Sequence, residues 1–271
     1  MPNIHPTAVV LEGAVIGEGT TVGPYSVIGH KVSIGRNNWI SSHVVIDGNT
    51  KIGDGNKVFQ FASIGAPPQD LKYKGEDSLL TIGNHNIIRE YVTIQPGTEG
   101  GGMETKVGDR NLFMACSHIG HDCVVGDYNI FANSAGISGH VIIGNHVTVG
   151  GLCGVHQFVR LGDYCFLSGG AMVGKDVPPF CTAQGDRAGL AGLNTVGMKR
   201  NGFDLESINL IKRLYRELFL GDGLFRERLE CAMEKYKEED LALSFLRFIS
   251  ESKRGVCMPR SASSSDTGDN L

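Results

Sequence analysis

The stretch IGEGTTVGPYSVIGHKVSIG, residues 16–35, places an aliphatic residue at every sixth position. The same step extends in both directions without a miss, from Ile4 to Ile64. It returns at Ile82, Ile88 and Ile94 and, shifted by one residue, runs from Val107 to Val173. A period of six fits neither an α-helix nor a simple hairpin, but it suits a short strand and a turn that form one side of a coil.

Three such sides close a triangular coil of eighteen residues, and stacked coils bury an apolar column that no single coil can bury alone. The pattern therefore predicts a mainly β fold, a parallel β-helix over residues 1–180. Two interruptions, residues 66–81 and 99–106, break the repeat. We expect them to be loop insertions on one face of the coil, where function concentrates.

After Val173 the repeat ends, and from Asp204 the apolar residues recur with a helical period. We expect residues 181–257 to form a small α-helical C-terminal domain, with Asp204 and Asp222 as N-caps of two helices. The polar end of the chain, residues 258–271, is predicted to be a disordered tail.

Composition excludes several classes of function. A net charge of −4 in 271 residues argues against a nucleic-acid binder, because such proteins usually carry a basic excess. The chain begins without a signal-like segment and contains no apolar run long enough for a transmembrane helix, so we expect a cytoplasmic protein. The seven cysteines contain no Cys-x-x-Cys pair and are interpreted as reduced thiols rather than a structural zinc site.

The stretch CSHIGHDC, residues 116–123, supplies the candidate site. In an eighteen-residue coil, positions i and i+18 lie one above the other. His121 should therefore stack on Gly139 and then Gln157, and Asp122 on His140. A glycine in such a stack leaves a backbone N–H that can approach a bound group closely.

Three interpretations of this cluster compete. His118, His121 and His140 could bind a metal, as in the γ-class carbonic anhydrases, although the histidine spacing differs from theirs. An imidazole beside a carboxylate could be a catalytic base, with a backbone N–H stabilising an oxyanion. Histidines at turns can also be solvated decoration of a repeat, which is how we interpret the isolated His5, His30, His43, His85 and His146.

Several motifs together resemble the UDP-N-acetylglucosamine O-acyltransferases of lipid A biosynthesis. They include QFASIG (60–65), PQDLKYKGE (68–76), SHIGHDC (117–123), VHQF (155–158), DVPPF (176–180) and MKRNGF (198–203), and the resemblance covers about residues 1–257. It implies a left-handed coil and a homotrimer with its sites between subunits. It also implies transfer of a 3-hydroxyacyl chain from acyl carrier protein to the 3-hydroxyl of UDP-N-acetylglucosamine, the first step of that pathway. No cofactor is implied beyond the phosphopantetheine that the acyl donor carries.

The resemblance also assigns roles to residues. His121 falls on the family's general base and Gly139 on its oxyanion donor, while Asp122 is a candidate to orient the imidazole. Gly169 falls where the family sets acyl-chain length, and a glycine there implies a longer chain. The implied substrate-binding residues are Gln69, Asp70, Lys72, His118, His140, His156, Gln157, Asn194 and Arg200. A basic run is a candidate docking surface for the acidic carrier protein and comprises Lys199, Arg200, Lys212, Arg213 and Arg216.

Three departures from the family pattern leave the acceptor open. Asn201 stands where many relatives have arginine, Gln95 where histidine is common, and Val196 where a glutamate often lies. An alternative acceptor is a 3-amino UDP-sugar, which would give an amide. Other rival functions are the later N-acyltransferase of the same pathway, a metal-dependent carbonic anhydrase and a non-catalytic solenoid.

Overall fold

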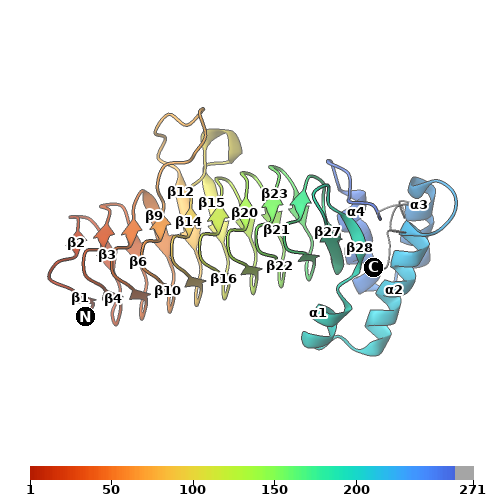
Figure 1. Cartoon of the computed structure of the whole chain (residues 1–271), viewed down its shortest axis with the longest axis horizontal. Helices are drawn as coiled ribbons and strands as arrows, with labels where there is room; N and C mark the ends of the chain where they lie inside the picture. Colours follow the sequence, from red (N-terminus) through yellow and green to blue (C-terminus); the bar gives the residue numbers. More distant parts are fainter. Residues whose placement is uncertain (260–271) are drawn as a thin grey trace, which may run out of the picture.

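The computed structural model describes residues 1–259. Of the tail that we expected to be disordered, residues 258–271, the first two are ordered, because Met258 and Pro259 pair with Leu190, and residues 260–271 lie outside the described residues. The chain winds into a long prism whose three faces are sheets of mostly two-residue strands, and all strand pairs are parallel except the last one of the first sheet (Figure 1). The predicted parallel β-helix is therefore confirmed.

The three faces are called sheets A, B and C. Sheet A contains β1 (Asn3–Ile4), β4 (Thr21–Val22), β7 (Trp39–Ile40), β10 (Lys57–Val58), β13 (Ile87–Ile88), β16 (Leu112–Phe113), β19 (Ile130–Phe131), β22 (Thr148–Val149), β25 (Phe166–Leu167), β27 (Cys181–Gln184) and β28 (Gly189–Leu193). Sheet B contains β2 (Val9–Val10), β5 (Val27–Ile28), β8 (Val45–Ile46), β11 (Ser63–Ile64), β14 (Thr93–Ile94), β17 (His118–Ile119), β20 (Gly136–Ile137), β23 (Gly154–Val155) and β26 (Met172–Val173). Sheet C contains β3 (Val15–Ile16), β6 (Ser33–Ile34), β9 (Asn49–Ile52), β12 (Leu79–Ile82), β15 (Glu104–Val107), β18 (Val124–Val125), β21 (Ile142–Ile143) and β24 (Arg160–Leu161).

The register of the strands is the predicted one. Ile28 pairs with Ile46, eighteen residues later, and Ile46 pairs with Ile64. Ile64 then pairs with Ile94, and Ile94 with Ile119. The extra residues in these two coils leave the prism at the corner between sheets B and C, as excursions over residues 65–78 and 95–103. Figure 1 shows both projecting from the same edge.

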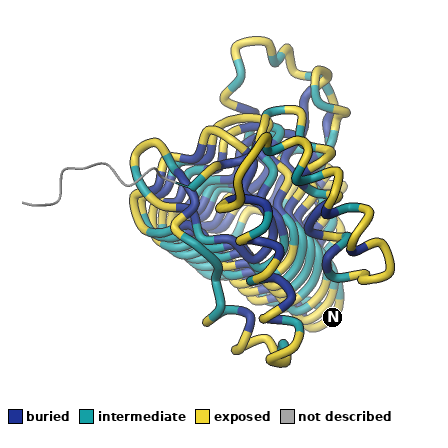
Figure 2. Tube along the Cα trace, turned by 90° about the vertical axis from the view of Figure 1, so that its right-hand side faces the viewer, coloured by how far each residue is buried: buried dark blue, intermediate teal, exposed yellow. Residues whose placement is uncertain are grey.

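Inward-facing side chains fill the prism from end to end. The second residue of most strands is fully buried, as Ile28, Ile64 and Ile137 illustrate at 0% exposure. Phe113 and Phe131 stack in successive coils, with ring centroids 4.8 Å apart. Seen from the end, the buried residues surround the axis and the exposed residues lie at the corners (Figure 2). Burial of this column is the main favourable term for the fold.

A ladder of buried asparagines closes the corner between sheets C and A. In each step the side-chain Oδ1 accepts a hydrogen bond from the backbone N–H of the asparagine one coil later, at 2.8 Å. The Nδ2 groups of the first four donate to glycine carbonyls at the same corner. The ladder consists of Asn38, Asn56, Asn86, Asn111 and Asn129. These bonds satisfy backbone groups that the turns would otherwise bury without partners.

Two further strands follow the last coil and precede the helices. Residues 181–193, which we grouped with the helical region, form β27 and β28, and β27 pairs in parallel with β25. Four helices follow: α1 (Thr195–Arg200), α2 (Leu205–Phe219), α3 (Phe225–Lys235) and α4 (Asp240–Ser250). A short 3-10 helix, η1 (Glu99–Gly101), lies in the second excursion.

One of the two predicted N-caps is correct. The Asp204 carboxylate accepts a hydrogen bond from the Ser207 N–H at 2.7 Å at the start of α2. The prediction for Asp222 was wrong, because the N-cap of α3 is Leu224 and no side chain caps that helix. The acidic residue precedes the first helical turn by too many residues to reach its free N–H groups.

The segment that follows α4 folds back onto the last coils. Isolated bridges join Asp176 to Val256 and Leu190 to Pro259. The buried Asp176 carboxylate accepts from the Arg160 N–H and from the Ser252 hydroxyl, both at 2.8 Å. These contacts fasten the segment after α4 to the coil.

We predict that Asn86→Ala lowers the melting temperature by about 5 °C. The variant removes the acceptor of the Asn111 N–H and the donor to the Gly108 carbonyl, leaving buried polar groups unpaired. Thermal unfolding followed by circular dichroism measures the change. Asn133→Ala, at an exposed corner, is the matched control and should melt with the wild type. Equal melting of both variants would show that the ladder does not stabilise the fold.

Candidate active site

The corner between sheets B and C brings the predicted cluster together. The His140 N–H donates to the His121 carbonyl at 2.9 Å, so the two residues occupy successive coils. Their rings meet edge to face with centroids 5.0 Å apart, and His140 stacks on Phe158 at 4.4 Å. The predicted stacking of residues eighteen positions apart is therefore confirmed at this corner.

His121 and Asp122 form a hydrogen-bonded pair. The His121 Nδ1 lies 2.7 Å from the Asp122 Oδ2, and the Asp122 side chain is fully buried. A buried carboxylate accepts the Nδ1–H and so leaves the Nε2 lone pair free to take a proton. His140 Nδ1 lies 3.9 Å from the same oxygen, beyond hydrogen-bonding distance.

Gly139 lies against the His121 ring. A Cβ at Gly139 would stand 2.6 Å from both the Nε2 and the Cε1 of the imidazole, so only glycine fits without displacing the ring. The Gly139 carbonyl accepts from the Phe158 N–H, but the Gly139 N–H donates to no acceptor within residues 1–259. A backbone N–H without a protein partner beside an imidazole is available to a bound substrate.

Burial acts on the other two histidines. It lowers the pKa of His118 below its usual 6.5, and the neighbouring His121 lowers that pKa further. Burial also lowers the pKa of His140, against the opposing charge of Asp122. Both shifts favour the neutral form of the imidazole. The Nδ1 of His118 lies 2.7 Å from the Thr93 hydroxyl, which fixes the ring in sheet B.

The two excursions form a hollow next to His140. It has a volume of about 530 Å³ and is lined by Asp70, Lys72, Lys74, Glu76, Thr98, Glu99, Gly100, His140 and Phe158. Asp70 and Lys72, predicted to bind substrate, thus face the histidine corner. Gln69 is exposed on the same excursion and does not line this hollow.

A second hollow, of about 310 Å³, lies on sheet B beyond the histidines. It is lined by Ser138, Gly154, Val155, His156, Met172, Val173 and Gly174. The Nδ1 of His156 lies 2.9 Å from the Arg254 guanidinium, and Gln157 beside it is exposed. Gly169 is exposed at the far corner of sheet B, where a Cβ would meet only the Gly151 carbonyl, at 3.5 Å.

Asn194 and Arg200 do not join the other predicted binding residues. They line a hollow of about 590 Å³ on sheet A, together with Ile130, His146 and the start of α1. Asn194 also caps α1, because its Oδ1 accepts from the Gly197 N–H at 2.9 Å. The predicted site is therefore divided between two faces of one chain.

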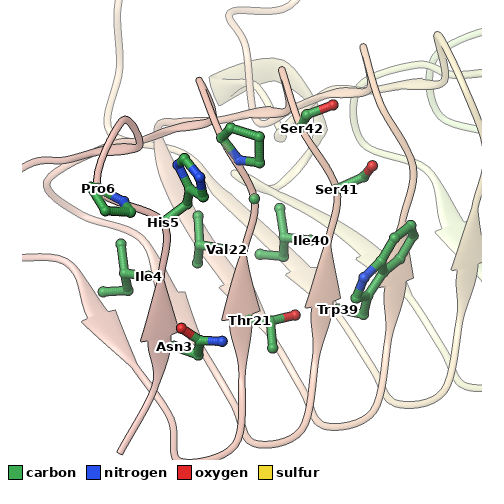
Figure 3. Close-up of a pocket in the computed structure, with 12 residues that line it drawn as sticks. Asn3, Ile4, His5, Pro6, Thr21, Val22, Trp39, Ile40, Ser41 and Ser42 are labelled. Carbon is green, nitrogen blue, oxygen red and sulfur yellow. The ribbon is translucent and has the colours of Figure 1, made fainter.

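A further hollow, of about 510 Å³, lies at the N-terminal end of the prism (Figure 3). Residues of sheet A and the adjoining corner line it, among them Asn3, His5, Thr21, Trp39 and Ser41. It belongs to the first three coils, whereas His121 lies several coils further along. Its lining contains His5 but no carboxylate.

Among residues 1–259, one group of side chains has the arrangement to hold a metal ion. The group is His121, Asp122 and His140, whose ligand atoms all lie within 4.8 Å of one another. It differs from the set that we had considered, because His118 is replaced by Asp122. Both oxygens of that carboxylate already accept hydrogen bonds from Thr98.

Sequence reasoning missed the threonines that support these groups. Thr98 donates to Asp122, Thr105 accepts from the Asp122 N–H, and Thr93 contacts His118. Thr93 and Thr98 lie outside the eighteen-residue spacing, because the second excursion, which contains Thr98, adds residues between Thr93 and His118. Counting strand pairs across the insertion, rather than residues, would have found Thr93 opposite His118.

Comparison with known proteins identifies the family. Residues 176–257 match the model of UDP-N-acetylglucosamine O-acyltransferase, domain 2. The acyl-[acyl-carrier-protein]–UDP-N-acetylglucosamine O-acyltransferase of Rickettsia bellii is 56% identical over 257 residues, covering 94% of this chain and 91% of that protein. The chain belongs to the UDP-N-acetylglucosamine O-acyltransferase family.

Solved structures of the UDP-N-acetylglucosamine O-acyltransferase family share the whole architecture. The enzyme from Moraxella catarrhalis is 44% identical, with a TM-score of 0.91 over 94% of this chain and 99% of that one. The enzyme from Francisella novicida is 41% identical, also with a TM-score of 0.91, over 94% and 93% of the two chains. Within residues 1–259, no helix has the length and apolar character needed to cross a bilayer.

We predict that the His118 imidazole titrates below pH 6.5. Because its folded-state pKa is lowered, the stability that it contributes is present above the unfolded value and is lost as the pH falls through the folded value. Histidine NMR signals followed from pH 8 to pH 5 report the midpoint, and the His118→Asn variant assigns the signal. A midpoint at or above 6.5 would contradict the burial argument.

Proposed function

We propose that this chain transfers a 3-hydroxyacyl group from acyl carrier protein to the 3-hydroxyl of UDP-N-acetylglucosamine, the first step of lipid A biosynthesis. The names of its relatives supply the donor and the acceptor. The observation that carries the proposal is the His121–Asp122 pair against Gly139, since it provides a base and a free N–H at one point. The cytoplasm is the proposed compartment, because all seven cysteines are free thiols.

The reaction follows from this arrangement. The Nε2 of His121 removes the proton of the sugar hydroxyl as its oxygen attacks the thioester carbonyl. The Gly139 N–H donates to the oxyanion that forms, and Asp122 stabilises the imidazolium through Nδ1. When the C–S bond breaks, the imidazolium returns the proton to the departing thiolate, so the products are the ester and the free thiol.

The same hollows accommodate the two substrates. Asp70 and Lys72 lie beside His140, where a lysine suits the phosphates of the sugar nucleotide. On sheet B, the outward positions Gly136 and Gly154 have no side chains and form a floor next to His118, and the Sδ of Met172 lies over Gly154. An acyl chain crossing this floor from Gly139 reaches the corner that holds Gly169.

The divided site supports a homotrimer. His121 and Arg200 lie on different faces of one chain, and a neighbouring copy would bring the missing face to each. Outward aliphatic side chains on sheet B are also exposed, with Val9 at 49%, Val27 at 37% and Val45 at 40%. Such exposed apolar rows are typical of surfaces covered by a partner.

The basic run on α1 and α2 is the proposed docking surface for acyl carrier protein. Lys199, Arg200, Arg213 and Arg216 are exposed, and Lys212 is half-buried. None of them forms a salt bridge within residues 1–259. Unpaired cations on a helix surface attract an acidic partner and raise its association rate.

We predict that the wild type acylates UDP-N-acetylglucosamine and that His121→Ala lowers kcat by at least about 10³-fold, because the general base is lost. Mass spectrometry of the product, with the 3-amino UDP-sugar offered in parallel, identifies the acceptor. If only the amide product forms, the acceptor is the 3-amino UDP-sugar and not UDP-N-acetylglucosamine. The absence of product with either sugar would remove the proposal.

We predict that Gly169→Met shifts the acyl preference toward shorter chains. The added side chain would occupy the end of the acyl path, and Gly169→Ala should give an intermediate effect because its Cβ fits. The ratio of kcat/KM for 3-hydroxydecanoyl over 3-hydroxytetradecanoyl donors should rise at least about 10-fold in the methionine variant. An unchanged ratio would leave chain length to other residues.

We predict that co-expressed His121→Ala and Arg200→Ala chains recover activity that neither has alone. If each site takes His121 from one subunit and Arg200 from its neighbour, random mixing restores about a quarter of the sites. Light scattering establishes the oligomeric state of the mixed and pure samples. Activity that stays at the level of the single variants would place both residues in the site of one subunit.

A further inference from the structure

The Asp122 carboxylate is held by a residue of the second excursion. Its Oδ1 accepts from the Thr98 N–H at 2.8 Å, and its Oδ2 accepts from the Thr98 hydroxyl at 2.6 Å. The same Oδ2 lies 2.7 Å from the Nδ1 of His121. Thr98 therefore contacts both oxygens of the group that orients the imidazole.

The contact is fully enclosed. The Asp122 side chain has no exposed surface, and Thr98 is only 4% exposed. Gly101 presses its backbone against the same carboxylate, since a Cβ there would overlap the carboxylate atoms. Hydrogen bonds to a charged group in such surroundings are strong, because water cannot replace either partner.

Thr98 is itself fixed by the fold of the excursion. Its carbonyl accepts from the N–H groups of Gly101 and Met103, at 3.1 and 2.9 Å, which closes the turn that contains η1. The next residue, Glu99, donates its N–H to the Glu76 carboxylate at 3.2 Å. Glu76 belongs to the first excursion, which also carries Asp70 and Lys72. The excursions thus contact each other at the point where Thr98 holds Asp122.

Without the two hydrogen bonds from Thr98, the Asp122 carboxylate could rotate away from the orientation that the reaction requires. An aspartate side chain rotates readily about its last torsion, and the backbone at Asp122 has a left-handed conformation with φ of 58°. With Thr98 in place, one carboxylate orientation satisfies three donors at once. That orientation presents Oδ2 to Nδ1 and so fixes the ring and the tautomer of His121.

We propose that Thr98 is a positioning residue of the acyl-transfer site, acting through Asp122 to hold His121 as a base with its proton on Nδ1. The proposal rests on the proposed function. It assigns a task to the second excursion, which otherwise supplies only part of the wall of the hollow beside His140.

The test is kinetic and uses a matched set of variants. Thr98→Val removes the hydroxyl and keeps the shape, Thr98→Ser keeps the hydroxyl, and Thr81→Val removes a hydroxyl–carboxylate bond of 2.9 Å to Glu104 on sheet C. We expect Thr98→Val to lower kcat about 10- to 100-fold with little change in KM, as for other orienting groups behind a reacting residue. Thr98→Ser and Thr81→Val should stay within about twofold of the wild type.

A double variant separates positioning from general damage. If Thr98 acts through Asp122, adding Thr98→Val to Asp122→Asn should cause little further loss, because the two changes remove the same function. Multiplicative losses would overturn the proposal, as would a Thr98→Val enzyme as fast as wild type or a Thr98→Ser enzyme as slow as Thr98→Val. If Thr98→Val is unstable, Thr98→Ala is judged by the same criteria.

A measurement that needs no activity keeps this proposal distinct from the proposed function. The ¹⁵N shifts of the His121 ring report which nitrogen carries the proton. We expect the Nδ1–H form in the wild type and in Thr98→Ser, and a mixture of both tautomers in Thr98→Val. A single unchanged tautomer in Thr98→Val would overturn the positioning role, whereas a fold without acyl transfer but with the expected shifts would overturn only the function.

Discussion

The hydrogen bonds between successive coils fix everything else in this molecule. Within the coils, each strand bonds in parallel to the strand one coil away, and three sheets do so around one axis. This register leaves no freedom to slide, because a shift by one residue would turn the aliphatic column outward. It also sets side chains from different coils side by side, which is how His121 comes to lie against Gly139. The residues of the site come together mainly because coils stack, and only secondarily because they are close in sequence.

Sequence periodicity predicts the features that arise from the repeat and fails where the chain leaves it. The coil, its core and the contact of Asp122 with the histidine corner are all obtained by counting in steps of eighteen. The asparagine ladder keeps that spacing from Asn38 to Asn56 and from Asn111 to Asn129, but the insertions lengthen the two steps between them, so the pattern is not apparent in the sequence. Thr98 and Glu76 contact their partners across loops whose paths no periodicity encodes. The prediction that Asp222 is an N-cap was wrong, because the helical period of apolar residues does not locate the first turn of a helix.

The two excursions change the chemistry of the corner without changing the scaffold. They interrupt the spacing between Ile64, Ile94 and Ile119, yet these residues remain paired and buried. A solenoid tolerates such insertions because each coil contacts only its neighbours. The inserted residues add lysines and carboxylates beside the histidines of the coil, and a buried hydroxyl that bonds to the carboxylate next to His121. The stacked coils thus supply the histidines of the site, and the two excursions supply the groups around them.

The return of the segment after α4 to the last coils has a consequence for cooperativity. Asp176 and Leu190, near the end of the prism, bridge to Val256 and Pro259 beyond α4. The helices therefore lie within a loop of chain that is fastened to the coil at both ends. Stacked repeats often lose structure progressively from an open end. Here the segment after α4 is bonded to the last coils, so separation of the helices from the prism also breaks these bonds, and the unfolding of the helical cap is coupled to that of the last coils.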